Sequence, residues 1–302
     1  MTLPLLGASG CSQAKRLLRD IRELYLVRDT GRIRTNMVCE LIQPFLKTMA
    51  DSSSNSNASS RTPTGIPGLD KLLTGGLPKN RTILLSGGPG TGKTILSSQY
   101  IVNGILDYEE TGVYVSLDEN KQHVFEEMLD FGWDFQDLEN NKKLIFLEAS
   151  PIRYLPAEIK VGKLTVGRKE FSMATLIEMI KTSVREIGAK RIVVDPVTTL
   201  VFQYEGVAAQ RNALVELMEA LADTGATCLI TTELRRPGFE RSLDYEEYLA
   251  HGVILLQQLQ VGKSLLRVIQ VEKMRKTPLD NQPRPYRITD TGIEVFPRES
   301  VL

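Results

Sequence analysis

The sequence of 302 residues lacks several features that would assign it to a common class of protein. Its 37 lysines and arginines equal its 37 aspartates and glutamates, and this balance argues against a nucleic-acid binder that works through bulk charge. No apolar run reaches the length of about 18 to 20 residues that a membrane span needs, and no secretory leader pattern opens the chain. We therefore expect a cytoplasmic protein with no membrane partner.

Cysteine and histidine are also scarce. Cys11, Cys39 and Cys228 are odd in number and far apart, and they form no pair at the spacing of metal ligands. We expect reduced thiols without a catalytic role. Apolar residues, in contrast, make up 42% of the chain, which is enough to bury a large core.

Composition divides the chain into three parts. Residues 51–60 contain six serines and two asparagines, which predicts a flexible linker over 49–61. Residues 1–48 carry eight basic and four acidic residues, with apolar side chains at helical spacing. Either this extension is a basic helix that binds a partner, or translation starts at Met49 and the extension is a gene-calling artefact. The folded domain is predicted over 62–302.

Short apolar runs alternate with longer amphipathic segments from residue 82 onward, which is typical of an α/β fold with a mostly parallel sheet flanked by helices. The expected strands are Thr82–Ser86, Val113–Leu117, Leu144–Leu147, Ile192–Val194 and Thr227–Thr231. The expected helices are 93–107, 121–131, 173–187 and 210–223. Three later strand-like runs without helices between them predict an antiparallel extension of the sheet: Val253–Gln257, Leu265–Val271 and Tyr286–Thr289.

Residues 87–94 match the pattern G-x-x-x-x-G-K-[ST] in full, between a predicted strand and a predicted helix. Glycines allow backbone N–H groups to converge on a triphosphate, and the amino end of the helix adds positive partial charge. Lys93 is expected to reach the terminal phosphates of ATP, and Thr94 to hold Mg²⁺. The predicted nucleotide-binding residues are Gly87, Gly88, Pro89, Gly90, Thr91, Gly92, Lys93 and Thr94.

Carboxylates follow two other predicted strands. Asp195 ends a buried strand, where a parallel sheet places its ligand crevice, and it fits the acidic partner of Mg²⁺. Asp118 and Glu119 are candidates to orient or deprotonate the attacking water. The alternative is that they only open the next helix as favourable charges. The sequence does not decide which of the two is catalytic, although Glu119 has the longer reach.

These residues belong to a longer pattern that resembles the KaiC-like branch of the RecA superfamily. The stretches that carry the resemblance are Thr64–Asp70, Gly75–Pro78, the loop over 87–94, Asp118-Glu119, Asp195, Thr231–Glu233, Val271–Arg275 and Tyr286–Glu294. The resemblance implies a RecA-type P-loop core, ATP hydrolysis, and a hexameric ring with nucleotide between adjacent subunits. It also implies that Asp118 and Glu119 serve hydrolysis.

Lys273 and Arg275 match a Lys-x-Arg segment that, in this family, reaches the phosphates bound by the neighbouring subunit. Two residues apart on a strand, both cations would share one face. Such a pair would stabilise charge on the terminal phosphate only in an assembled ring. The alternative is a solvated, charged edge strand.

The sequence also departs from the founding member of the family. It has one domain of this kind instead of two, and Glu246-Glu247-Tyr248 stands where the phosphorylated domain has a Ser-Thr pair, which disfavours autokinase activity. The leading prediction is a ring-forming ATPase that regulates an unidentified protein partner. A RecA/RadA-like DNA-dependent ATPase is the alternative, because the basic segment 151–170 suits either subunit contact or single-stranded nucleic acid. A third reading is a scaffold that ATP closes, with incidental hydrolysis.

Overall fold

The computed structural model describes residues 60–149, 160–161, 164–165, 173–233, 245–261 and 264–301, which all belong to one compact unit, Ala58–Leu302. The predicted extension over 1–48, nearly all of the predicted linker and most of segment 151–170 lie outside the described residues.

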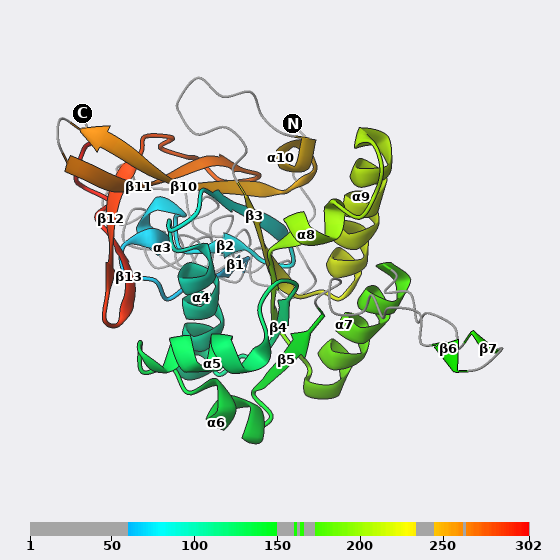
Figure 1. The fold of residues 1–302 in the computed structure, drawn as a ribbon. Helices are drawn as coiled ribbons and strands as arrows, with labels where there is room; N and C mark the ends of the chain where they lie inside the picture. Colours follow the sequence, from blue (N-terminus) through cyan, green and yellow to red (C-terminus); the bar gives the residue numbers. More distant parts are fainter. Residues whose placement is uncertain are drawn as a thin grey trace, which may run out of the picture. The chain divides into compact units, whose positions relative to one another are not determined.

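A nine-stranded sheet forms the centre of the described region, in the order β13-β12-β11-β10-β3-β9-β8-β4-β5 (Figure 1). The strands from β10 to β5 pair in parallel. The strands from β10 to β13 pair antiparallel, so the expected α/β fold with its antiparallel extension is confirmed. The bounds are β3 Thr82–Gly87, β4 Gly112–Ser116, β5 Leu144–Glu148, β8 Arg191–Asp195, β9 Thr227–Glu233, β10 Gly252–Val261, β11 Ser264–Met274, β12 Arg284–Thr289 and β13 Gly292–Val295.

Helices cover both faces of this sheet, and each face has its own apolar core (Figure 1). On one face lie α4 (Lys93–Tyr108), α5 (Lys121–Leu129) and α6 (Phe135–Asn140). On the other lie α7 (Met173–Ile187), α8 (Val197–Val201) and α9 (Val207–Asp223). The side chains of β3, β4, β8 and β9 alternate between the two cores, which explains why these strands read as continuous apolar runs.

Some elements differ from the expected ones. Helix α5 ends at Leu129, because a turn follows in which the N–H of Gly132 donates to the carbonyl of Leu129 and Gly132 takes a φ of 77°. Helix α9 begins three residues before the expected start, directly after Gly206. Short elements that the sequence did not predict include α3 (Leu69–Leu72), α6, α8, α10 (Tyr245–Leu249) and β13. Two small antiparallel pairs were also not predicted: β1 (Arg61–Thr62) with β2 (Leu77–Pro78), and β6 (Lys160–Val161) with β7 (Leu164–Thr165).

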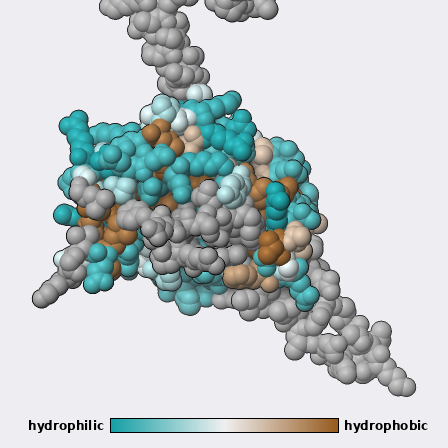
Figure 2. All heavy atoms as spheres, turned by 90° about the horizontal axis from the view of Figure 1, so that it is seen from above, coloured by the Kyte–Doolittle hydropathy of each residue, from teal (hydrophilic) through white to brown (hydrophobic). Residues whose placement is uncertain are grey.

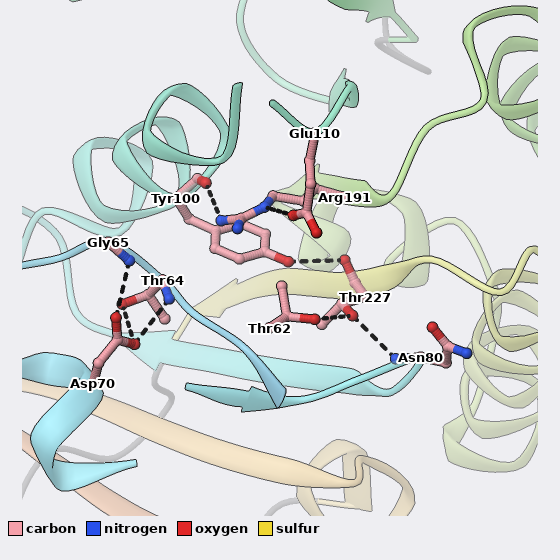
Figure 3. Close-up of polar contacts among 9 residues, drawn as sticks. All are labelled: Thr62, Thr64, Gly65, Asp70, Asn80, Tyr100, Glu110, Arg191 and Thr227. Atoms are coloured by element: carbon pink, nitrogen blue, oxygen red, sulfur yellow. Dashed lines mark hydrogen bonds and ion pairs between the residues drawn. The ribbon is translucent and has the colours of Figure 1, made fainter. Parts of the chain in front are cut away.

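The opening segment is tied to the sheet by side-chain hydrogen bonds (Figure 3). The hydroxyls of Thr62 and Thr227 lie 2.9 Å apart, and the N–H of Asn80 donates to Thr227 Oγ1 at 3.0 Å. The carboxylate of Asp70 accepts the N–H groups of Thr64, at 2.8 Å, and Gly65, at 3.1 Å. Residues 62–80 are thereby held at the end of the sheet where the parallel strands begin.

Where the face drawn in Figure 2 is not covered by grey atoms, brown side chains form small separate groups among hydrophilic ones. Among the residues that the structure describes, the large apolar side chains that are exposed are Leu106, Tyr108, Leu129, Phe202, Val207, Tyr248 and Leu265. Among the described helices, none has both the length and the apolar composition required to cross a bilayer.

A buried cation lies between α4 and β8. Arg191 is fully buried, and its Nε donates to Glu110 Oε2 at 2.6 Å while its guanidinium also donates to the carbonyl of Tyr100 at 2.8 Å (Figure 3). The guanidinium carbon lies 4.7 Å from the centre of the Tyr100 ring. Helix α4 can pass over this group only because residue 104 is glycine, since a Cβ there would lie 2.2 Å from Arg191 Nε.

We predict that Gly104→Ala destabilises the protein. Alanine normally gains about 1 kcal/mol over glycine within a helix. Here the added methyl group would displace a buried, paired guanidinium, and overpacking of this kind costs about 1 to 3 kcal/mol. The midpoint of urea unfolding should therefore fall, whereas Asp107→Ala on the exposed side of α4 serves as a control that should not lower it. A higher midpoint for Gly104→Ala would show that the core accommodates the methyl group.

Candidate functional site

The loop between β3 and α4 has a backbone that only glycine permits at several positions. Gly90 and Gly92 have φ of 70° and 87°, in the left-handed region. A Cβ on Gly87 would lie 2.6 Å from Thr91 Oγ1 and 3.0 Å from the carbonyl oxygen of Leu256. Helix α4 begins after Gly92 without a side-chain cap among the described residues, which leaves its first N–H groups for an anion.

Contacts from distant strands hold this loop in place. Thr91 Oγ1 donates to the carbonyl of Gly88 at 2.8 Å. Gln258 on β10 donates to the carbonyl of Gly90 at 3.1 Å, and the Tyr286 hydroxyl on β12 donates to the carbonyl of Thr91. Sequence reasoning missed Gln258 altogether and noted Tyr286 only within a family motif, because such contacts have no local sequence signature.

The side chain of Lys93 lies against the phosphate loop, from which it is expected to reach the terminal phosphates. Its ammonium group donates to the carbonyls of Gly87, at 2.9 Å, and Gly88, at 3.2 Å. Burial lowers the pKa of Lys93, while the carboxylates of Asp195 and Glu233 act in the opposite direction. The Lys93 ammonium group is therefore bound to the backbone of the phosphate loop itself.

Four neighbouring parallel strands bring the predicted acidic residues to the same edge as the loop. Gly87 at the end of β3 pairs with Glu233 at the end of β9, and Ser116 at the end of β4 pairs with Asp195 at the end of β8. Asp118 and Glu119 follow directly after β4. The structure therefore brings all the predicted site residues to this edge of the sheet, except Lys273 and Arg275.

Asp195 is only 7% exposed, and hydroxyl groups from both neighbouring strands bind its carboxylate. The Tyr114 hydroxyl on β4 donates to Oδ2 at 2.8 Å, and the Thr231 hydroxyl on β9 donates to Oδ1. Burial, and then the nearby Asp195 carboxylate, raise the pKa of Tyr114 well above its ordinary value. Sequence reasoning gave Tyr114 no role, because the strand that lies beside Asp195 depends on strand order, which no local pattern reveals.

Asp118 and Glu119 lie in a turn that polar contacts fix. Ser116 Oγ donates to the carbonyl of Glu119 at 2.6 Å and accepts the N–H of Glu119 at 3.1 Å. The Thr199 hydroxyl on α8 donates to the carboxylate of Asp118. Partial burial, followed by the carboxylates of Glu127, Asp195 and Asp118, raises the pKa of Glu119. The two adjacent carboxylates therefore have different surroundings, which the sequence could not reveal.

Lys273 and Arg275 lie at the opposite end of the sheet. Lys273 donates to the carbonyls of Glu247, at 3.0 Å, and Tyr248, at 3.1 Å, at the end of α10. The backbone N–H of Arg275 donates to the carbonyl of His251, whose own N–H donates to Thr82 at the start of β3. Between Thr82 and Gly87, at the two ends of β3, the strand extends about 16 Å.

Strand β11 extends three residues beyond the predicted end at Val271, so that it carries Lys273 but not Arg275. Strand β11 ends at Met274, one residue before Arg275, and its pairing with β10 shifts register between Val253 and Ile254. Arg275, which is exposed, follows the end of this strand directly, and its positive charge contributes, after burial, to lowering the pKa of Lys273.

The oxygen donors near the loop fit a magnesium ion held largely by nucleotide and water. Val193 packs into the core on the α4 side, so Asp195, two residues later on the same strand, faces that side too. Helix α4 opens with Lys93 and Thr94. Within the described ranges, no group of three or more His, Cys, Asp or Glu side chains forms a metal cluster. Mg²⁺ at a phosphate site needs only one or two protein ligands, so this arrangement suits it.

The strand, glycine-rich loop and helix, with an acidic residue ending a nearby strand, define a P-loop nucleotide-binding protein. The chain belongs to the KaiC family of ATPases, because the family model described as "ATPase: KaiC" matches residues 62–300.

Individual relatives agree with this assignment. The circadian clock oscillator protein KaiC of Synechococcus elongatus is 34% identical over 251 residues, which cover 83% of this chain but only 47% of that protein. The UPF0273 protein MJ1359 of Methanocaldococcus jannaschii is 35% identical, covering 78% of this chain and 96% of that one. The crystal structure of the KaiC-like protein PH0186 from Pyrococcus horikoshii has a TM-score of 0.67 at 33% identity, covering 78% of this chain and 99% of that chain.

We predict that Glu119→Gln stabilises the folded protein slightly at neutral pH. A carboxyl whose pKa is raised by folding binds its proton more tightly in the folded state, so its ionisation above that pKa costs stability. The difference in unfolding free energy between Glu119→Gln and wild type should shrink as the pH falls and vanish below the ordinary value near 4.5. Urea titrations at several pH values measure it. The control is Glu219→Gln on the exposed side of α9, and an identical pH trend there would contradict the prediction.

Proposed function

We propose that this protein hydrolyses ATP in a magnesium-dependent reaction, assembles into a hexameric ring and uses turnover to regulate a protein partner. The observation that carries the proposal is the row of groups at the ends of β3, β9, β8 and β4, where the phosphate loop, Glu233, Asp195 and the pair Asp118-Glu119 adjoin. Membership of the KaiC family of ATPases supports it.

Each group has a distinct task in this proposal. The loop N–H groups and Lys93 bind the phosphates, while Asp195 and Thr94 hold the cation. When bound, Mg²⁺ neutralises charge that develops on the phosphates. Asp118 and Glu119 orient the attacking water and accept its proton. Thr199 binds the carboxylate of Asp118, and burial raises the pKa of Glu119. Both stay candidates for proton removal.

Lys273 and Arg275 lie too far from the phosphate loop of their own chain to act there, since they are at the opposite end of β3. A role in catalysis therefore requires a second copy of the chain whose loop faces this end. This placement supports the shared site that the family resemblance implies, with the nucleotide between subunits. In the isolated chain Lys273 is bound to α10, so the ring would have to draw its ammonium toward the nucleotide.

No described residue favours the alternative of a DNA-dependent ATPase, because most of the basic segment 151–170 lies outside the described ranges. Steady-state ATPase assays with and without single-stranded DNA separate it from the leading proposal. A scaffold with incidental hydrolysis would show ATP-dependent assembly with unchanged partner binding when hydrolysis is blocked. Autokinase activity stays disfavoured, and the cytoplasmic location stays a prediction.

We predict that the double variant Asp118→Asn with Glu119→Gln loses at least about 100-fold in kcat, because the amides keep shape and polarity but cannot accept the proton. ATP affinity should stay close to that of wild type, since neither carboxylate holds the phosphates. Turnover assays and equilibrium binding measure the two effects. The two single variants show which residue contributes more to activating the water. If the double variant turns over ATP at the wild-type rate, neither carboxylate activates the water, and Glu233 is the next candidate.

We also predict complementation between two inactive variants. Arg275→Ala lacks the donated cation but keeps its loop, and Lys93→Ala is the reverse. Loss of a cation of this kind costs about 10³-fold or more in kcat. Mixed rings should recover part of the activity, because some interfaces pair an intact loop with an intact Arg275. If Arg275 acted on its own chain, co-assembled mixtures would recover nothing.

A further inference from the structure

Tyr114 is a buried polar side chain next to the candidate site for which the proposed function has no use. It lies on β4, is fully buried, and stacks on Phe146 with ring centres 5.3 Å apart and planes 7° apart. Phe135 packs edge-on against the same ring at 6.0 Å. The apolar rings fix the phenol in one orientation, so its hydroxyl is aimed at Asp195 Oδ2, 2.8 Å away.

Thr231 approaches the same carboxylate from the other side. Strand β8, which carries Asp195, runs between β4 and β9, so each neighbouring strand supplies one hydroxyl donor. Tyr114 binds Oδ2 and Thr231 binds Oδ1, and both donors are fully buried. A carboxylate oxygen has two lone pairs, so each oxygen keeps one for a further partner.

We propose that Tyr114 and Thr231 are positioning residues that fix the Asp195 carboxylate for a divalent cation, so that they set the affinity for the cation and not the affinity for the nucleotide. The proposal rests on the proposed function, since Asp195 is there the acidic partner of Mg²⁺. Outer hydrogen bonds orient the groups that bind a metal, and their loss typically weakens metal affinity about 10- to 100-fold. Neither hydroxyl lies on the phosphate loop, so nucleotide contacts should survive their removal.

Tyr100 provides a matched control for Tyr114. It is equally buried, and its hydroxyl also donates one hydrogen bond, to the carbonyl of Thr227 at 3.1 Å (Figure 3). Thr227 begins β9, whereas Thr231 and Asp195 lie near the ends of their strands, so Tyr100 is bound at the opposite end of the sheet. A purely structural role of the hydroxyl would make Tyr114→Phe and Tyr100→Phe behave alike.

The test uses electron paramagnetic resonance to measure how tightly the full chain binds Mn²⁺, which serves as a spectroscopic probe. The non-hydrolysable analogue adenylyl imidodiphosphate is present as the nucleotide. We expect Tyr114→Phe to weaken the affinity for Mn²⁺ at least about 10-fold. The affinity for the analogue, measured in EDTA, should stay within about twofold of wild type. Tyr100→Phe should leave both affinities unchanged. Equal Mn²⁺ affinity in wild type and Tyr114→Phe, or an equal loss in both tyrosine variants, would overturn the proposal.

Thr231 gives a second, independent readout that does not depend on how the aromatic core tolerates Tyr114→Phe. Thr231→Val removes the hydroxyl at nearly constant volume and should weaken the affinity for Mn²⁺. Thr231→Ser keeps the hydroxyl and should retain most of that affinity. Valine and serine variants with the same Mn²⁺ affinity would count against a positioning role. If wild type binds the analogue but retains no Mn²⁺ with it, the proposed magnesium site itself is wrong, and if it binds neither, the proposed function fails.

Discussion

The parallel pairing of β3, β9, β8 and β4 sets the spacing of every chemical group in the candidate site. Each strand ends in a residue of different chemistry: the phosphate loop after Gly87, then Glu233, then Asp195, then the turn with Asp118 and Glu119. Because adjacent strands lie about 4.8 Å apart, the row spans only a few strand spacings. Apolar cores pack against these strands on both faces of the sheet.

The antiparallel strands after residue 250 have two separate relations to the site. Near one end of the sheet, Gln258 and Tyr286 bind the carbonyls of the phosphate loop. Near the other end, Lys273 and Arg275 lie far from that loop. One continuous segment therefore supports the site of its own chain and, in the proposed ring, presents cations to another.

Local sequence patterns predicted most of the central sheet and the long helices, because strands buried on both faces and amphipathic helices leave strong periodic signals. Helix 173–187 has the predicted bounds, and the strands differ from the predicted ones by one to a few residues at their ends. The short elements were missed, since α3 and α6 have too few residues for a period to be recognised. Their formation depends on contacts such as Asp70 with the N–H groups of Thr64 and Gly65.

The sequence by itself determined the phosphate loop, the identity of its lysine and threonine, and the candidate acids, because backbone convergence on phosphate demands glycines at a fixed spacing. Tertiary structure alone decided which groups meet. Tyr114, Thr199 and Thr231 lie on three different elements, yet each binds a carboxylate of the candidate site. Their pairing follows from strand order and register, which arise from packing of distant segments, and no local spacing in the chain encodes such contacts.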